Sequence, residues 1–201
     1  MAVKSIALKE RIVLNQTEAR VATVENAPID TLIRDQAAHV SADEFREALS
    51  QVASSVSIVT TDGAHGIAGF TCSAVCTVTD EPPTILVCVN RKSAANGVIK
   101  ANGVLCVSSL GADQVALSQM FAGVGKVPMH ERFGGSQWGS LATGSPYCKT
   151  SRVALDCRIA EIREVGTHTV FFAEVLSTVN ATADEPLIYH RRNYATIRNV
   201  T

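Results

Sequence analysis

The segment from Gly66 to Asn90 contains small polar side chains between two apolar runs that meet at Pro82-Pro83. The cluster comprises Thr71, Cys72, Ser73, Cys76, Thr77 and Thr79. Small side chains on a strand let a flat ligand approach the backbone, where free N–H and C=O groups can bond to it. The pattern therefore indicates a site for a planar ring with apolar faces and hydrogen-bonding atoms along one edge, as in a flavin.

A second group of polar residues comes at the end of the second apolar run. Ser93 follows Asn90, Arg91 and Lys92, and its position predicts the N-cap of a short helix. The N–H groups at a helix N-terminus suit a phosphate, although an ordinary cap with solvated charges has the same appearance.

His168 lies just past the turn predicted at Gly166. A neutral imidazole can donate one hydrogen bond, for instance to a carboxamide oxygen. A lone histidine at a turn is also typical of a solvent-facing position, so the residues alone leave both interpretations open.

The elements that would position these groups follow from hydrophobic periodicity. Ser41 and Glu44 form a capping box, which predicts a helix over residues 42–54. The glycine-rich stretch 122–150 is expected to be mostly loop. Further helices are expected over residues 93–101 and 112–121, and strands over residues 56–61, 67–78, 85–89, 103–110, 153–165, 167–179, 187–190 and 194–198. Seven or eight strands with two or three short helices favour an antiparallel barrel over a doubly wound sheet.

Composition excludes several classes of function. The 201 residues carry a net charge of −1, with no basic cluster larger than Arg191-Arg192, which disfavours nucleic-acid binding and membrane-surface attachment. The apolar runs are of strand length and no signal-peptide core is visible, so a soluble cytoplasmic protein is expected. Five cysteines lie in strand-like sequence, where free thiols act as small hydrophobes: Cys72, Cys76, Cys88, Cys106 and Cys157. Their spacing lacks the second pair that a zinc site needs, so no metal site is expected.

Motifs of other nucleotide enzymes and of hydrolases are incomplete. The Gly-Val-Gly-Lys sequence ending at Lys126 resembles the end of a Walker loop, but Met120 and Val127 stand where Gly and Ser or Thr are required. No G-x-G-x-x-G follows a predicted strand, which disfavours a Rossmann fold. The absence of a G-x-S-x-G elbow disfavours a hydrolase.

Four segments resemble the short-chain flavin reductases, in that family's order: FTCSAVCTVTDEPPTILVCVNRKSA, FAGVGKVPMHERF, GTHTVFFAEV and PLIYHRRNY. The resemblance is strongest to the reductase components of two-component flavin monooxygenases, such as the 4-hydroxyphenylacetate hydroxylase reductase and its pyrimidine-degradation counterpart. It covers residues 41–199 and leaves residues 1–40 as an extension or arm. It implies a mainly β, antiparallel, Greek-key-like split barrel that binds flavin as a homodimer.

The resemblance also implies roles for individual residues. Residues 71–74 would line the isoalloxazine and ribityl chain, and Ser93 with Lys92 would bind the flavin phosphate. His168 would face the flavin and hold the nicotinamide, although Thr167 stands where the family has Asp in Gly-Asp-His. Phe121 would cover the flavin. The full set of implied cofactor-binding residues is Thr71, Cys72, Ser73, Ala74, Thr77, Val78, Cys88, Asn90, Lys92, Ser93, Phe121, His168, Tyr189 and Arg191, of which His168 is the expected catalytic residue.

The implied activity is an NAD(P)H:flavin oxidoreductase of the EC 1.5.1 type, with NADH favoured over NADPH and FAD or FMN as the flavin. Reduced flavin would pass to a separate monooxygenase of aromatic or heterocyclic substrates, by diffusion or transient contact. The same barrel also hosts flavin- or haem-binding proteins without turnover and pyridoxamine-phosphate-oxidase-like enzymes, and a purely structural interaction domain is a further alternative.

Overall fold

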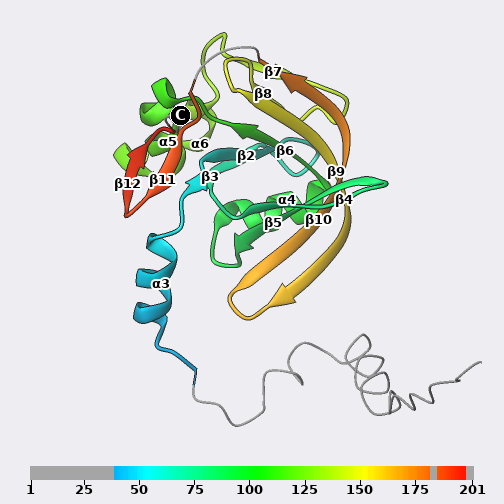
Figure 1. Ribbon diagram of the computed structural model, residues 1–201. Helices are drawn as coiled ribbons and strands as arrows, with labels where there is room; N and C mark the ends of the chain where they lie inside the picture. Colours follow the sequence, from blue (N-terminus) through cyan, green and yellow to red (C-terminus); the bar gives the residue numbers. More distant parts are fainter. Residues whose placement is uncertain (1–38, 182–184, 198–201) are drawn as a thin grey trace, which may run out of the picture. The chain divides into compact units, whose positions relative to one another are not determined.

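The computed structural model describes residues 39–181 and 185–197 (Figure 1). The chain divides into two units, residues 1–40 and residues 41–201. The expected N-terminal arm lies outside the described residues up to position 38. The strand expected over residues 194–198 likewise extends past Ile197, the last residue described.

The second unit begins with α3 (Ala42–Ser50), which has the expected capping box: Ser41 accepts from the Glu44 N–H, and the Glu44 carboxylate accepts from the Ser41 N–H at 2.9 Å. The helix ends four residues before its predicted end at residue 54. Its Ser50 carbonyl accepts from the Arg191 N–H at 2.7 Å, and the chain then enters β1 (Ser54–Ser55), which pairs with β11 (Ile188–His190). The bond from Arg191 and the pairing of β1 with β11 therefore end the helix earlier than its local sequence predicts.

Seven antiparallel strands form the main sheet, which curves into the barrel of Figure 1. This confirms the expected antiparallel barrel. Two register shifts between β9 and β10 bend this long strand pair, since an extra residue on one strand increases the local twist. The strands, in their order across the sheet, are β3 (Ala68–Cys72), β2 (Ser57–Thr61), β6 (Val104–Ser109), β9 (Val153–Val165), β10 (His168–Asn180), β5 (Pro83–Asn90) and β4 (Val75–Asp80).

The single strand expected over residues 67–78 is divided in two. Strand β3 ends at Cys72 and β4 begins at Val75, so the chain passes from one margin of the sheet to the other through Ser73 and Ala74. Cys72 is consequently buried and Cys76 exposed, whereas an unbroken strand would place both on one face.

Shorter elements surround the barrel. Helix α4 is capped at its C-terminus by Gly103, whose φ of 70° is the left-handed conformation that glycine adopts without strain. The predicted helix over residues 112–121 begins as a 3₁₀ turn, η1, before α5. Residues 122–150 are mostly loop, as expected, with short elements inside. The remaining elements are α4 (Ala94–Asn102), η1 (Ala112–Gln114), α5 (Val115–Phe121), η2 (Val124–Lys126), α6 (Met129–Arg132), β7 (Trp138–Ser140), β8 (Pro146–Cys148) and β12 (Asn193–Ala195).

Two apolar clusters hold the unit together. The larger fills the barrel and includes Val87, Leu105 and Phe171 together with Ile99 of α4. The smaller consists of Val56, Ile58, Leu110, Phe121 and Leu187. All six cysteines are free thiols. Within the two described ranges, no helix has the length and apolar character required to cross a membrane.

Candidate functional site

The Ser73–Ala74 connection forms a corner where three cavities meet. Their volumes are about 530, 390 and 200 Å³, and Ser73 lines all three. Both connecting residues are exposed, and the small side chain of each leaves the neighbouring backbone accessible. The Ala74 carbonyl accepts from the Cys88 N–H at 3.0 Å, which fixes the corner against β5. The corner thus offers a backbone surface of the kind that a planar ligand needs.

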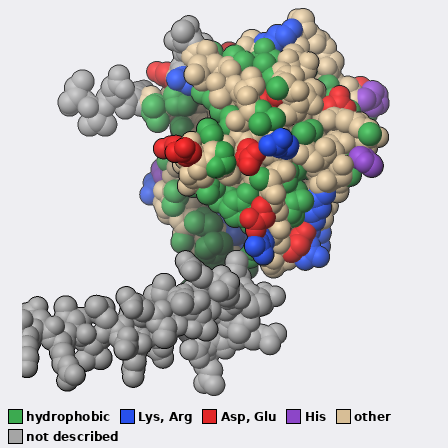
Figure 2. Space-filling view, turned by 90° about the vertical axis from the view of Figure 1, so that its right-hand side faces the viewer, with side chains coloured by type: hydrophobic (Ala, Val, Ile, Leu, Met, Phe, Trp, Pro, Cys, Tyr) green, Lys and Arg blue, Asp and Glu red, His purple; other side chains and the backbone are tan. Residues whose placement is uncertain are grey.

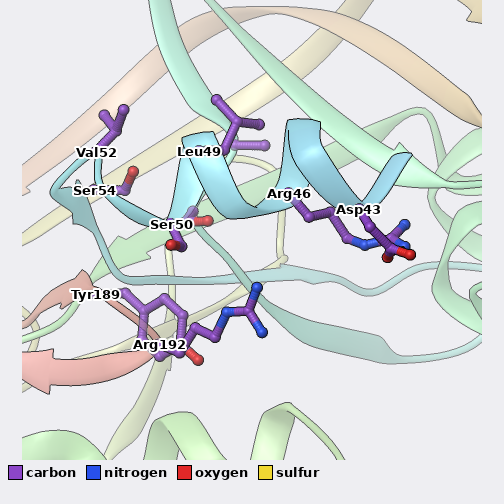
Figure 3. Close-up of a pocket in the computed structure, with 10 residues that line it drawn as sticks. Asp43, Arg46, Leu49, Ser50, Val52, Ser54, Tyr189 and Arg192 are labelled. Atoms are coloured by element: carbon purple, nitrogen blue, oxygen red, sulfur yellow. The ribbon is translucent and has the colours of Figure 1, made fainter. Parts of the chain in front are cut away.

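The largest of these three cavities lies between α3 and the hairpin of β11 and β12. Figure 3 shows Arg46 and Leu49 of the helix on one side and Tyr189 with Arg192 on the other. Its arginines are paired with carboxylates: Arg46 with Asp43, and Arg192 with Glu47. Most residues of this lining were not predicted as site residues, because residues 42–54 and the β11–β12 hairpin are far apart in the chain.

The other two cavities extend from the same corner. The 390 Å³ cavity is rich in hydroxyl groups, contributed by Ser54, Ser55, Ser57, Ser73, Thr77 and Ser109. The 200 Å³ cavity is lined by Thr71, Cys72, Ser73, Val56, Ala122, Tyr189 and Tyr194. The structure therefore brings the predicted residues 71–74 together with Tyr189 and Thr77. Tyr189 and Tyr194 pack edge to face, with ring centroids 5.5 Å apart.

Two of the predicted side chains at the corner are engaged by the protein itself. The Thr71 hydroxyl donates to the Ser118 carbonyl of α5 at 2.6 Å. Burial raises the pKa of the Cys72 thiol to about 11, and it also raises the pKa of the Cys88 thiol. Burial therefore favours the protonated form of both thiols, which is a weak nucleophile.

The end of β5 carries the predicted phosphate site. The Asn90 side chain accepts from the Lys92 N–H at 2.9 Å, which shapes the turn into α4. Ser93 is the N-cap of α4, as predicted, but its hydroxyl makes no capping bond. The Asn96 N–H donates to the Ser93 carbonyl at 3.0 Å, so the Ser93 hydroxyl and the N–H groups of Ala94 and Ala95 are the donors left for an anion.

His168 is the first residue of β10 and lies opposite Asn90 in the register of β5. Its side chain is exposed, and the Thr167 hydroxyl lies 2.9 Å from Nδ1. Because Cys88 contacts the Ser73–Ala74 corner and Asn90 is two residues further along β5, His168 belongs to the same end of the sheet as the cavities.

An ion-pair network supports this end of the sheet. Glu164 accepts from Lys100 and Thr169 and lies 3.4 Å from the Arg91 guanidinium. The hydrogen bond from Lys100 is the main cause that lowers the pKa of the Glu164 carboxyl. The buried Asn96 amide donates to the Thr169 hydroxyl at 3.0 Å, which links α4 to β10.

Eight of the fourteen predicted site residues line none of the three cavities: Val78, Cys88, Asn90, Lys92, Ser93, Phe121, His168 and Arg191. Three of them have the following surroundings. Phe121 is 2% exposed and packs edge to face on Phe133 with centroids 5.3 Å apart, so its ring is part of the apolar core. The Arg191 guanidinium donates to the Gln51 side chain at 2.8 Å, and Arg192 lines the cavity instead. Val78 is the unpaired residue of a β-bulge, 46% exposed, and is not among the residues that line the three cavities.

Arg191 and Arg192 occupy the turn between β11 and β12 with positive φ values of 50° and 62°. Such angles are uncommon for residues with a side chain and persist where surrounding contacts impose them. Here the contacts run to α3, through the Arg191 backbone to Ser50 and through Arg192 to Glu47. In the sequence, this turn is visible only as two basic residues between short strands. That pattern does not predict which groups of α3 the two arginines contact.

Comparison with known proteins gives a consistent result. Residues 49–198 match the flavin reductase like domain. The chain is 46% identical to the FMN reductase (NADH) RutF of Stutzerimonas stutzeri over 157 residues, which cover 78% of this chain and 89% of that protein. A crystal structure from Haemophilus somnus, assigned as a flavin reductase, is 41% identical with a TM-score of 0.73, over 79% of this chain and all of that one.

A third relative is a nitrilotriacetate monooxygenase component B homologue from Mycobacterium thermoresistibile. Its crystal structure is 28% identical with a TM-score of 0.71, over 78% of this chain and 86% of that one. Sequence and fold agree across most of the chain, and the expected resemblance is confirmed. This protein belongs to the flavin reductase-like family.

Proposed function

We propose that this protein is an NADH-dependent flavin reductase that reduces FMN and supplies the reduced flavin to a separate monooxygenase. The observation that carries the proposal is the convergence of three cavities on the Ser73–Ala74 corner, in a chain whose curated relatives are named FMN reductase (NADH). Those names favour FMN among the two flavins considered above, and NADH over NADPH. We place the reductase domain at residues 41–199.

The described residues fit a flavin mononucleotide. In our proposal, the isoalloxazine ring lies on the backbone of residues 71–74, whose exposed Ser73 and Ala74 present no large side chain. The hydroxyl-rich cavity accommodates the ribityl chain. The unused Ser93 hydroxyl and the N-terminus of α4, with Lys92 beside them, bind the phosphate.

Flavin and nicotinamide together supply the hydride chemistry, so the protein acts by binding and orienting the two rings. His168 donates from its imidazole to the nicotinamide carboxamide and thereby holds that ring over the corner. Tyr189 lines both the 530 Å³ and the 200 Å³ cavities and, in this proposal, forms the side of the nicotinamide site. Neither role requires a charged side chain.

The reduced flavin has a separate destination in this proposal. One related structure is the flavin reductase component of a two-component tryptophan halogenase, and another is a homologue of a monooxygenase component. Cavities that open to solvent allow a flavin to leave after reduction. We therefore retain a monooxygenase of aromatic or heterocyclic substrates as the partner, reached by diffusion or transient contact.

We also propose a homodimer. No residue of α3 is buried: Phe45 and Leu49 are 54% and 51% exposed, and Val52, just past the end of the helix, is 56% exposed. Figure 2, viewed from the side of β4 and β9, shows further hydrophobic side chains among polar ones. Light scattering on the purified protein is expected to give twice the chain mass of 21.3 kDa, and Leu49→Glu to shift the mass toward the monomer. A monomeric parent protein would contradict this.

The activity is tested by NADH oxidation with FMN, FAD or riboflavin added in turn, and repeated with NADPH. The proposal predicts NADH oxidation that depends on added flavin and is fastest with FMN. A protein that binds flavin but oxidises neither nucleotide would instead be a binding module, and one that binds no flavin would be a structural domain.

A further inference from the structure

Thr167 contacts the histidine that the proposed function places against the nicotinamide. Its hydroxyl oxygen lies 2.9 Å from His168 Nδ1, a normal hydrogen-bond length between neighbouring side chains. We propose that Thr167 is a positioning residue that donates this hydrogen bond and thereby holds His168 as the tautomer with the proton on Nε2. The inference rests on the proposed function for its consequence in catalysis, but not for the tautomer itself.

The turn that carries both side chains is held rigidly. The Arg91 N–H donates to the Thr167 carbonyl at 3.0 Å, and the Arg91 guanidinium donates to the Gly166 carbonyl at 3.1 Å. The same guanidinium lies 3.4 Å from Glu164. His168 then enters the β10 ladder opposite Asn90. Because the backbone of the turn and the Arg91 side chain bonded to it are fixed, the Thr167 hydroxyl remains next to Nδ1 without a large entropic cost.

The direction of the hydrogen bond follows from the groups around the imidazole. Arg91 lies at the same turn through its bonds to the Gly166 and Thr167 carbonyls, and its guanidinium is 3.4 Å from Glu164 of β9. Glu164 is occupied by Lys100, Thr169 and Arg91, and within residues 39–181 and 185–197 no carboxylate accepts from the His168 ring. In the same described ranges the Thr167 hydroxyl has Nδ1 as its one side-chain acceptor. In our proposal the hydroxyl donates to Nδ1, which leaves Nε2–H free; because Thr167 is exposed, solvent is the other acceptor open to its hydroxyl.

The identity of residue 167 sets what Nε2 can do. With threonine, Nε2–H is a donor, which suits the neutral oxygen of a carboxamide. A carboxylate at this position accepts hydrogen bonds only, so it would hold the proton on Nδ1 and turn the neutral Nε2 into an acceptor. Aspartate in place of Thr167 would thus reverse the hydrogen-bonding direction of the neutral ring.

The tautomer is measured by long-range ¹H–¹⁵N NMR on histidine-labelled protein without flavin or NADH, at about pH 8, where an unperturbed imidazole is neutral. His168→Gln identifies the His168 signals. The parent and Thr167→Ser are expected to show a protonated Nε2 and a bare Nδ1, whereas Thr167→Asp moves the proton to Nδ1. A protonated Nδ1 in the parent would overturn the inference.

Kinetics supply the second readout. Thr167→Val keeps the shape and removes the hydroxyl, so KM for NADH is expected to rise about fivefold, the scale of one lost hydrogen bond, with FMN affinity unchanged. Thr167→Ser is expected to keep the parent KM. An unchanged KM in Thr167→Val would also overturn the inference. If the parent reduces no flavin at all, the proposed function fails, while the NMR result still decides the tautomer.

Discussion

Gly69 on β3 offers a test of how tightly the core behind the site is packed. A Cβ atom at this position would lie 2.7 Å from Phe121 Cε1 and 3.1 Å from Phe133 Cζ. The first distance is shorter than any ordinary carbon contact, so one ring must move. Phe121 is 2% exposed and also contacts Trp138, with ring centroids 5.4 Å apart, which leaves it no free space.

Overpacking of this kind costs about 1–3 kcal/mol, while exchange of Gly for Ala returns roughly 0.5–1 kcal/mol of backbone entropy. We therefore expect Gly69→Ala to lower the free energy of unfolding by about 1.3 kcal/mol, the difference between the midpoints of those two ranges. Gly97→Ala is the matched control, because a Cβ there meets no atom within 4 Å and the residue lies exposed on α4. That variant should gain about 0.5–1 kcal/mol.

Urea unfolding of the parent and the two variants, followed by circular dichroism, measures both changes. A domain of this size shifts its Tm by about 2–4 °C per kcal/mol, so thermal unfolding should separate the variants as well. If Gly69→Ala were as stable as the parent, or more stable, the packing of Phe121 against β3 would be wrong. An equal loss in Gly97→Ala would show that the effect is not one of packing.

Three further outcomes follow from the site. His168→Ala is expected to slow NADH oxidation roughly tenfold or more, equivalent to about 1.4 kcal/mol or greater, and an unchanged kcat/KM in stopped flow would count against its role. Ser93→Ala should weaken FMN binding and leave riboflavin almost unaffected, with no change in helix content because the hydroxyl makes no capping bond; equal losses for both flavins would remove the phosphate assignment. The free energy of unfolding should fall as pH rises from about 9 toward 11, because the Cys72 pKa is raised to about 11 and the folded state retains a proton that the unfolded chain releases; a flat urea-unfolding profile across that range would contradict this.

Much of the fold follows from local sequence signals. The Ser41 capping box, the Pro82-Pro83 turn and the Gly166 turn each set an element boundary through local chemistry, and the corresponding elements are present. The prediction of residues 71–74 depends on small side chains that let a flat ligand approach the backbone, and on the family resemblance. The break after Cys72 was not predicted, since Ser73 and Ala74 are compatible with either a strand or a turn.

The errors concern contacts between distant segments. Phe121 follows a predicted helix and precedes a glycine-rich loop, which does not reveal whether its ring faces core or ligand. Arg192, and not the predicted Arg191, lines the cavity. This placement depends on the left-handed turn and on its bonds to the α3 region, more than 130 positions earlier in the chain. Such pairings depend on tertiary structure, and single-sequence periodicity contains no information about them.

A crystal structure with FMN bound is the most direct test of the account. We expect the isoalloxazine ring on the backbone at Ser73 and Ala74, with the phosphate at Ser93 and the N-terminus of α4. A flavin bound elsewhere, with this corner closed by the protein's own side chains, would contradict the central claim.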